Sequence, residues 1–388
     1  MSVAVPKGFK AAGVAAGIKD GDVLDLALVT ADPGTVGAAV FTVNSAAAAP
    51  VVLSRRHLES TKQVRAVVLN SGTANAATGA EGDQAASATA SHAAASLGCN
   101  PDQVLVCSTG TIGSPLPLAA VQAGLDKAVT ELAVGAEAGE RSARAIMTTD
   151  TVPKQTSVVS DAGWSVGAMA KGSGMIRPDM ATMLAVVTTD AVLDSEAAQQ
   201  SLIQAVDVSF HELNVDGCAS TNDTVILLAS GASGVVPSPD DFDKALATAC
   251  RTLAVAMAQD AEGATKMVVL RVSGAKDAEH ARHYGRTVAD SALVRSAFYG
   301  GDPNWGRIVG ALGTVAPPGV VAAVEIAFCG VTVARDGVGV PHDEDALAET
   351  MAAGDFSVHL KVGDGPGEAH VLTTDLTPDY VRFNGERS

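Results

Sequence analysis

Apolar positions along the chain follow two spacings. Short apolar runs that end at Gly, Asn, Asp or Pro are typical of buried strands, whereas apolar residues that recur every three to four positions are typical of helices. The expected strands are 36–52 (around an Ala-rich connection), 66–69, 104–107, 156–160, 164–170, 183–187, 225–229, 267–272, 321–328, 356–362 and 368–374. The expected helices are 83–97, 118–132, 137–147, 195–208, 242–257 and one that begins near Asp277.

Both kinds of element run through the 388 residues, of which 47% are hydrophobic and 3% aromatic. A chain of this length is sufficient for more than one domain. The 39 Gly and the abundant Ala favour closely packed layers of helix and sheet. From about residue 321 onward, the pattern predicts a smaller β-rich unit.

The charge balance excludes some classes of partner. A formal net charge of −17 argues against binding to nucleic acid or to an anionic membrane, because both need clustered Lys and Arg. The five cysteines include no C-x-x-C pair, and no apolar segment approaches the ~20 residues of a membrane span. We therefore predict a cytoplasmic protein with reduced thiols. His280 and His283 lack further ligands nearby, so they are interpreted as surface residues of a helix, and we expect neither a metal site nor a cofactor.

The stretch from Lys171 to Leu184, KGSGMIRPDMATML, contains the main candidate for chemistry. Thr182 follows the small residue Ala181 and precedes an apolar run, so its hydroxyl is a candidate to attack the Ala181 carbonyl and break the chain there. A threonine with a free α-amine, whose pKa is roughly 8, carries its own base. The same residues are also typical of an ordinary strand that begins with a β-branched residue. Taken alone, they favour that simpler interpretation.

Four loops add candidates. The strand at 66–69 runs into Asn70-Ser71-Gly72-Thr73, and the strand at 104–107 runs into Ser108-Thr109-Gly110. In the second of these loops, a hydroxyl beside a glycine N–H is suited to bind a developing oxyanion, although a plain tight turn is the simpler interpretation. The first loop is suited to a turn that exposes its backbone, or to an ordinary Asx turn that supports the fold. The hydroxyl cluster at 148–151 is suited to grip a carboxylate or to cap a helix. Glu262 is a candidate ligand for a substrate cation or an exposed loop acid.

Taken in order, these motifs resemble the ornithine acetyltransferase family, the glutamate N-acetyltransferases of arginine biosynthesis. The resemblance covers essentially the whole chain. Its markers are the Asn70 loop, the STG at Ser108, MTTDT at Met147, KGSGM and PDMATML from Lys171, STNDT within the loop from Asp216, AEG at Ala261 and DPNWGR from Asp302. Each motif is weak alone, but seven in one order are specific.

The resemblance implies an α+β fold, a layered αββα sandwich that resembles but is distinct from N-terminal-nucleophile hydrolases, with a smaller C-terminal α/β domain. It implies self-cleavage between Ala181 and Thr182, giving an α chain of 1–181 and a β chain of 182–388 that includes the smaller domain, approximately 285–388. Two copies of each chain are expected to form a heterotetramer. The implied nucleophile is Thr182, the implied oxyanion hole is Thr109 and Gly110, and the implied substrate contacts are Thr148, Lys171, Thr182, Glu262, Asn384 and Ser388.

The expected reaction is acetyl transfer from N2-acetyl-L-ornithine to L-glutamate through an acetyl ester on Thr182. Such a ping-pong cycle is sensible because donor and acceptor share an amino-acid head that one pocket can hold in turn. The residues leave open whether acetyl-coenzyme A also serves as donor. Two other classes remain: a self-cleaving amidase or aminopeptidase that gives the acyl group to water, and a non-catalytic binding protein of the same fold.

Overall fold

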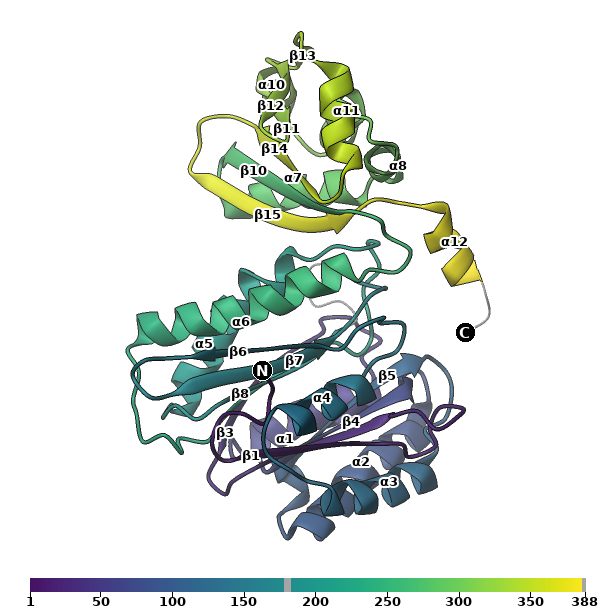
Figure 1. The fold of residues 1–388 in the computed structure, drawn as a ribbon, viewed down its shortest axis with the longest axis vertical. Coiled ribbons are helices and arrows are strands. Elements are labelled where there is room, and N and C mark those ends of the chain that lie inside the picture. The colour runs from purple at the N-terminus through teal and green to yellow at the C-terminus, as the bar shows by residue number, and fades with distance from the viewer. Residues whose placement is uncertain (178–182, 386–388) are drawn as a thin grey trace. The chain divides into compact units, whose positions relative to one another are not determined.

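The computed structural model describes residues 1–177 and 183–385, which divide into two compact units (Figure 1). The first unit contains residues 1–175, 183–211 and 219–257, and the second contains 176–177, 212–218 and 258–385. Among the described residues, no helix is long and apolar enough to cross a membrane. Helices and strands are mixed in both units, so the α+β class expected from the sequence is confirmed.

The first unit contains a four-stranded sheet in the order β1-β2-β4-β5. Its strands are β1 (Phe9–Val14), β2 (Leu26–Ala31), β4 (Ala66–Thr73) and β5 (Val104–Thr111). The strands β4 and β5 run parallel. Their apolar residues, such as Val68 and Val106, are almost fully buried, which explains the uninterrupted hydrophobic runs in the sequence.

A five-stranded sheet of the same unit has the order β3-β9-β8-β7-β6. Its strands are β3 (Val36–Phe41), β6 (Lys154–Val159), β7 (Ser165–Lys171), β8 (Leu184–Thr189) and β9 (Thr224–Ala229). The strands expected at 156–160 and 164–170 are confirmed as β6 and β7, which pair antiparallel as a hairpin across the turn at Asp161–Gly163. Strand β7 then pairs with β8, with Lys171 opposite Leu184.

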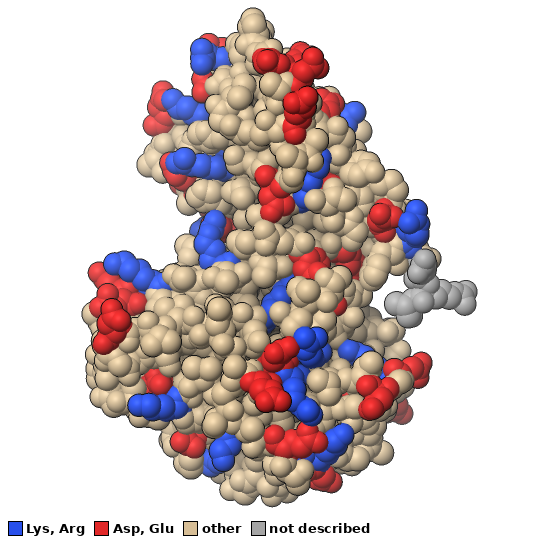
Figure 2. All heavy atoms as spheres, in the orientation of Figure 1, with Lys and Arg blue, Asp and Glu red and all other residues tan. Residues whose placement is uncertain are grey.

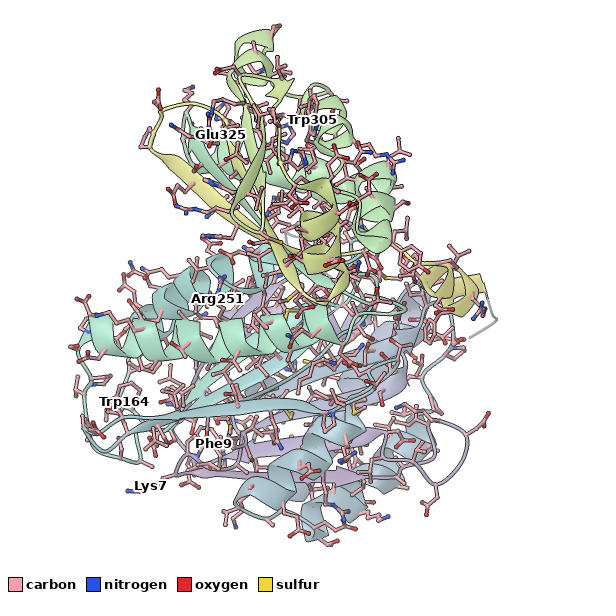
Figure 3. All side chains as sticks on the ribbon, turned by 45° about the horizontal axis from the view of Figure 1, so that its top comes forward. Lys7, Phe9, Trp164, Arg251, Trp305 and Glu325 are labelled. Carbon is pink, nitrogen blue, oxygen red and sulfur yellow. The ribbon has the colours of Figure 1, made fainter. Side chains whose placement is uncertain are left out.

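Apolar side chains of the two sheets share one core. Phe9 of β1 (Figure 3), Leu69 of β4, Met169 of β7 and Val186 of β8 belong to a single buried cluster. On the other face of the four-stranded sheet, a second cluster joins β2, β4 and β5 to α2 (Gly79–Leu97) and α3 (Leu118–Thr130). The remaining helices of this unit are α1 (Ala49–Ser60), α4 (Ala136–Ala145), α5 (Ser195–Asp207) and α6 (Pro239–Gln259). Helix α5 contacts β3 and β9 of the five-stranded sheet, and Figure 1 shows α6 next to α5 on the same side of this sheet.

The second unit is built on a six-stranded sheet in the order β13-β12-β11-β14-β10-β15. Its strands are β10 (Met267–Ala275), β11 (Glu325–Phe328), β12 (Val331–Arg335), β13 (Val338–Gly339), β14 (Phe356–Lys361) and β15 (Gly367–Thr374). Its helices are α7 (Ala278–Asp290), α8 (Ala292–Gly300), α9 (Trp305–Leu312), α10 (Pro318–Ala323), α11 (Glu344–Ala352) and α12 (Pro378–Gly385). Trp305 and Glu325 of this unit are labelled in Figure 3.

Three expectations from the pattern are wrong. Of the strands expected at 36–52 around an Ala-rich connection, the first is β3, but a helix replaces the second, because α1 begins at Ala49 with Pro50 in its first turn, where proline is well tolerated. The helix expected at 83–97 begins four residues earlier, at Gly79. The strand expected at 321–328 begins only at Glu325, because α10 occupies Pro318–Ala323.

Candidate active site

The oxyanion-hole candidates Thr109 and Gly110 lie at the carboxyl end of β5, beside the Asn70 motif at the carboxyl end of the parallel strand β4. The two motifs were expected to be loops, but both strands continue through them, to Thr73 and Thr111. Ser71 therefore pairs with Thr109, and Gly72 pairs with Gly110. Neighbouring parallel strands thus present the two motifs at one edge of the sheet.

Gly110 cannot be replaced here without displacing the neighbouring strand. Its φ is +131°, and a Cβ atom on it would lie 2.3 Å from the carbonyl carbon of Gly72. The residue is exposed, whereas the preceding Thr109 is only 3% exposed. The absence of a side chain thus leaves the Gly110 backbone approachable to a ligand.

Lys171 joins two of the candidate hydroxyls at the end of β7. Its Nζ donates to Thr148 Oγ1 at 2.7 Å and to Thr109 Oγ1 at 3.3 Å, and the side chain is almost fully buried. A protonated lysine has donors and no acceptor, so both threonine oxygens must accept from it. Each hydroxyl hydrogen therefore stays available for a negatively charged oxygen.

Asp150 fixes the positions of Lys171 and Thr148 through hydrogen bonds and charge. Its Oδ1 accepts from Lys154 Nζ at 2.6 Å and from the Gly172 N–H at 2.8 Å, and its Oδ2 accepts from the Thr148 N–H and lies 3.9 Å from Lys171 Nζ. Burial alone would raise the pKa of the Asp150 carboxyl, but the charges of Lys171 and Lys154 with these hydrogen bonds hold it below its usual value. Asp150 is therefore ionised at neutral pH and fixes Lys171 beside the hydroxyls.

Lys19 is a further cation near the site that the sequence reasoning missed. Its Nζ donates to the Met147 carbonyl at 2.6 Å. Burial lowers the pKa of Lys19, and the charge of Lys171 lowers it further, against the opposite effects of Asp25 and Asp150. Three lysines thus gather beside two aspartates, an excess of positive charge that favours a carboxylate or an oxyanion. No motif marks Lys19, because it lies in the sequence far from the residues it approaches.

Met183, the first described residue after the expected cleavage site, also lies near the candidate active site. Ala181 and Thr182, the expected cleavage site and nucleophile, lie outside the described residues. The backbone N–H of Met183, the next residue along the chain, donates to Asp223 Oδ1 at 2.8 Å. The Met183 carbonyl accepts from the Thr224 N–H at 3.1 Å. Met183 is therefore fixed at both of its backbone polar groups.

The STNDT loop ties these strand ends together. Asn222 Nδ2 donates to the Ala74 carbonyl at 2.7 Å and to the Ser108 carbonyl at 2.9 Å. Ser108 in turn donates from its hydroxyl to Asn70 Oδ1 at 2.6 Å. The two asparagines of the sequence motifs thus bind backbone and hydroxyl groups of the protein itself. The loop that carries them sets the spacing between the ends of β4, β5 and β9.

Glu262 and Asn384, two of the expected substrate contacts, lie together in the second unit. Asn384 Nδ2 donates to Glu262 Oε2 at 3.1 Å. Gly263 supports this contact, because its φ is +64° and a Cβ there would lie 2.3 Å from the backbone nitrogen of Tyr380 in α12. Ser388 lies outside the described residues. The pair of a carboxylate and an amide is chemically suited to bind an ammonium group.

Charged side chains of both signs lie on the face of the molecule shown in Figure 2. On the face shown in Figure 2, acidic and basic residues are interspersed over each unit. In the described part of the chain, no group of three or more His, Cys, Asp and Glu side chains is placed to hold a metal ion.

Comparisons with known proteins support the family resemblance that the order of the motifs indicates. The family model described as ArgJ family matches residues 10–388. The arginine biosynthesis bifunctional protein ArgJ of Thermobifida fusca is 47% identical over 390 residues, with 100% of both chains covered. The protein of the same name from Streptomyces coelicolor is 45% identical over 389 residues, also with 100% of both chains covered.

Two solved structures are also similar. One is the ornithine acetyltransferase of Mycobacterium tuberculosis complexed with ornithine, with 44% identity, 47% of this chain and 96% of that chain covered, and a TM-score of 0.45. The other is the arginine biosynthesis bifunctional protein ArgJ of Bacillus halodurans, with 33% identity, 52% and 97% of the two chains covered, and a TM-score of 0.49.

The full-length matches define an acyltransferase of arginine biosynthesis. The chain belongs to the ArgJ family.

Proposed function

We propose that the chain transfers an acetyl group from N2-acetyl-L-ornithine to L-glutamate through an ester on Thr182, after cutting itself between Ala181 and Thr182. One observation carries the assignment of the site: Lys171 is buried with its Nζ on the hydroxyls of Thr109 and Thr148. The same residue pairs across the sheet with Leu184, two positions after Thr182. Lys171, which bonds to these two hydroxyls, thus also pairs with the strand that follows the proposed nucleophile in the sequence.

The first half of the reaction makes the ester. The Thr182 hydroxyl oxygen bonds to the acetyl carbon, and its proton passes to the Thr182 α-amine. The oxygen of the tetrahedral intermediate receives hydrogen bonds from the Thr109 hydroxyl and the Gly110 N–H. A single donor of this kind is worth about 3 kcal/mol of barrier. The intermediate then breaks its carbon–nitrogen bond, the departing amine takes the proton, and ornithine leaves.

The second half reverses these steps with a new amine. The α-amine of glutamate attacks the ester carbon, and the oxygen of Thr182 leaves and recovers a proton. Because donor and acceptor carry the same α-carboxylate, one cationic region can bind each in turn. The lysines around Asp150 supply such a region, with Thr148 and Lys171 as proposed carboxylate contacts. Glu262, Asn384 and Ser388 are proposed contacts for the rest of the substrates, and the Glu262–Asn384 hydrogen bond supports a role in binding an ammonium group.

The cut divides the protein into an α chain, residues 1–181, and a β chain, residues 182–388, with a smaller domain at approximately 285–388. We propose that two copies of each chain assemble and that the enzyme works in the cytoplasm, which suits its five free cysteines. The two sheets that share a core in the first unit support a layered αββα sandwich, resembling but distinct from N-terminal-nucleophile hydrolases.

Replacement of Thr182 tests this proposal. Thr182→Ala removes the hydroxyl, so the purified protein should remain one chain by intact mass and should transfer no acetyl group. Thr182→Ser is the matched control, because it keeps a hydroxyl and should yield two chains with measurable transfer. A cut and active Thr182→Ala protein would refute the proposal.

The acceptor and the donor are tested in the same assay. With wild-type enzyme and acetylornithine, glutamate should consume the acyl-enzyme faster than water does. Release of acetate at an equal rate without glutamate would instead identify an amidase. A parallel reaction with acetyl-coenzyme A and glutamate measures whether that donor is used.

A further inference from the structure

Asp216 accepts hydrogen bonds from three separate segments of the second unit. Its Oδ1 accepts from the Ile176 N–H at 2.9 Å and from the Cys218 N–H at 3.1 Å. Its Oδ2 accepts from the Tyr380 hydroxyl of α12 at 3.3 Å. The acetyl-transfer steps make no use of this carboxyl group. A carboxylate with partners in three segments fixes the positions of these segments relative to one another.

The hydroxyl of Tyr380 is the donor of its hydrogen bond with Asp216. Burial raises the pKa of Tyr380, the charge of Asp216 raises it further, and the buried cation Arg295 opposes these effects in part. The hydroxyl is therefore protonated at neutral pH and donates to the carboxylate. Hydrogen bonds to an ionised acceptor are stronger than those between neutral groups.

Helix α12 depends on such polar contacts for its position. It has eight residues, none of which is buried, and a helix this short is not stable in isolation. At its start, the buried Thr377 hydroxyl accepts from the Tyr380 N–H at 3.1 Å and donates to the Gly263 carbonyl. The Tyr380 side chain then adds its hydrogen bond to Asp216. Tyr380 thus ties the helix to the second unit at both its backbone and its ring.

The same helix carries Asn384, one of the proposed substrate contacts. Tyr380 and Asn384 are four residues apart, so they lie on one face of α12. Asn384 Nδ2 donates to the Tyr380 carbonyl at 3.1 Å and to Glu262 Oε2 at 3.1 Å. An amide nitrogen has two hydrogens, and these two contacts can use both. The amide oxygen of Asn384 is then the atom of this side chain that can accept from a ligand.

We propose that Asp216 is a positioning residue for substrate binding, an inference that rests on the proposed function. Through Tyr380 it holds α12 in place, so that Asn384 and Glu262 together bind an ammonium group. N2-acetyl-L-ornithine bears its single positive charge on the side-chain ammonium, which is the group that this pair would bind. Because the role is one of binding, its loss should change KM more than kcat.

Tyr380→Phe is the informative variant, because it removes the hydroxyl and keeps the ring. We expect the KM for acetylornithine to rise about tenfold, which corresponds to 1.4 kcal/mol, with kcat within about twofold of wild type. Asp216→Ala should raise KM at least as much. The double variant should be no worse than Asp216→Ala, because the hydroxyl has already lost its partner there.

Tyr299→Phe is the matched control. It removes the same hydroxyl from a ring of α8 that is 46% exposed, and it should leave KM unchanged. Thermal unfolding of every variant is followed by circular dichroism. A merely structural role of Tyr380 would lower the amount of folded enzyme and so the apparent kcat, but not KM, because KM does not depend on enzyme concentration.

Three results would overturn the inference. These are a KM of Tyr380→Phe within about twofold of wild type, an equal rise in Tyr299→Phe, or effects of Tyr380→Phe and Asp216→Ala that multiply in the double variant. The first result needs only Tyr380→Phe, so the test does not depend on the folding of Asp216→Ala.

Glu262→Gln in the same assay separates failure of this inference from failure of the proposed function. If Glu262→Gln raises KM and Tyr380→Phe does not, the substrate contact stands and only the role of Asp216 is refuted. If Glu262→Gln leaves KM unchanged, the proposed contact itself is wrong. A wild-type enzyme that transfers no acetyl group would refute the proposed function as a whole.

Discussion

Replacement of Gly110 by alanine tests whether the ends of β4 and β5 form the oxyanion hole. The new Cβ atom would lie 2.3 Å from the carbonyl carbon and 2.5 Å from the carbonyl oxygen of Gly72, and 2.6 Å from the Thr73 nitrogen. All three atoms belong to backbone, which cannot rotate away as a side chain does. The strand pair must therefore separate, and the Gly110 N–H must move with it.

Two costs to stability add in this variant. A residue other than glycine at a φ of +131° costs roughly 1–3 kcal/mol. The collision with β4 costs roughly another 1–3 kcal/mol, as overpacking does in cores. Loss of one oxyanion donor should lower kcat by about 10²–10³-fold. The KM values should change little, because the donor acts on the intermediate more than on the bound substrates.

Gly113→Ala is the matched control. Gly113 has a φ of +85° and no atom within 4 Å of the added Cβ, so the variant carries the conformational cost without the collision. Acetyl transfer from acetylornithine to glutamate is measured at saturating substrates, and thermal unfolding is followed by circular dichroism. Gly110→Ala with a kcat within about twofold of Gly113→Ala would show that the Gly110 N–H does not stabilise the intermediate.

Three further variants test the buried charges and the second unit. Asp150→Asn should destabilise the protein by about 3–5 kcal/mol at neutral pH, because it leaves Lys154 and Lys171 without their buried anion. Since the folded-state pKa of Asp150 is depressed, this difference should be present above the ordinary carboxyl pKa of 3.8 and vanish as the pH falls through the lower folded value, which unfolding at a series of pH values will show. Lys171→Met should reduce kcat by about 10²-fold or more, as loss of an electrostatic group does; activity equal to wild type would contradict its role. Glu262→Gln should raise KM for the amino-acid substrates by about tenfold, the effect of 1.4 kcal/mol, with unchanged unfolding; a lower kcat at unchanged KM would exclude a binding role.

Local patterns predicted most elements well because each carries its own signal. The hairpin of β6 and β7 was predictable from two alternating runs around Asp161-Ala162-Gly163. The end of α2 was predictable from Gly98, which adopts a left-handed φ of +65°. Such signals depend on a few adjacent residues and need no knowledge of tertiary contacts.

The motif loops were predicted less well because tertiary pairing decided their structure. Ser108-Thr109-Gly110 has the composition of a turn, yet it extends β5 beside Ser71 and Gly72 of β4. Lys154 carries no local sign of function, and Asp223 is marked only as one residue of the STNDT motif. The structure shows more: folding buries Lys154 against Asp150, and one oxygen of Asp223 has no hydrogen-bond partner among the described residues.

The order of strands in the five-stranded sheet has a consequence for the life of the finished enzyme. Strands β8 and β9, which follow the proposed cut, lie between β7 on one side and β3 on the other, which precede it. Each severed piece thus lacks the hydrogen-bonding neighbours that the other supplies. The protein must therefore fold as a single polypeptide and cut itself afterwards. Heating that separates the two chains is then irreversible, because neither chain can refold without the strands of the other. The lifetime of the mature enzyme is then set by its rate of unfolding rather than by an equilibrium between folded and unfolded states.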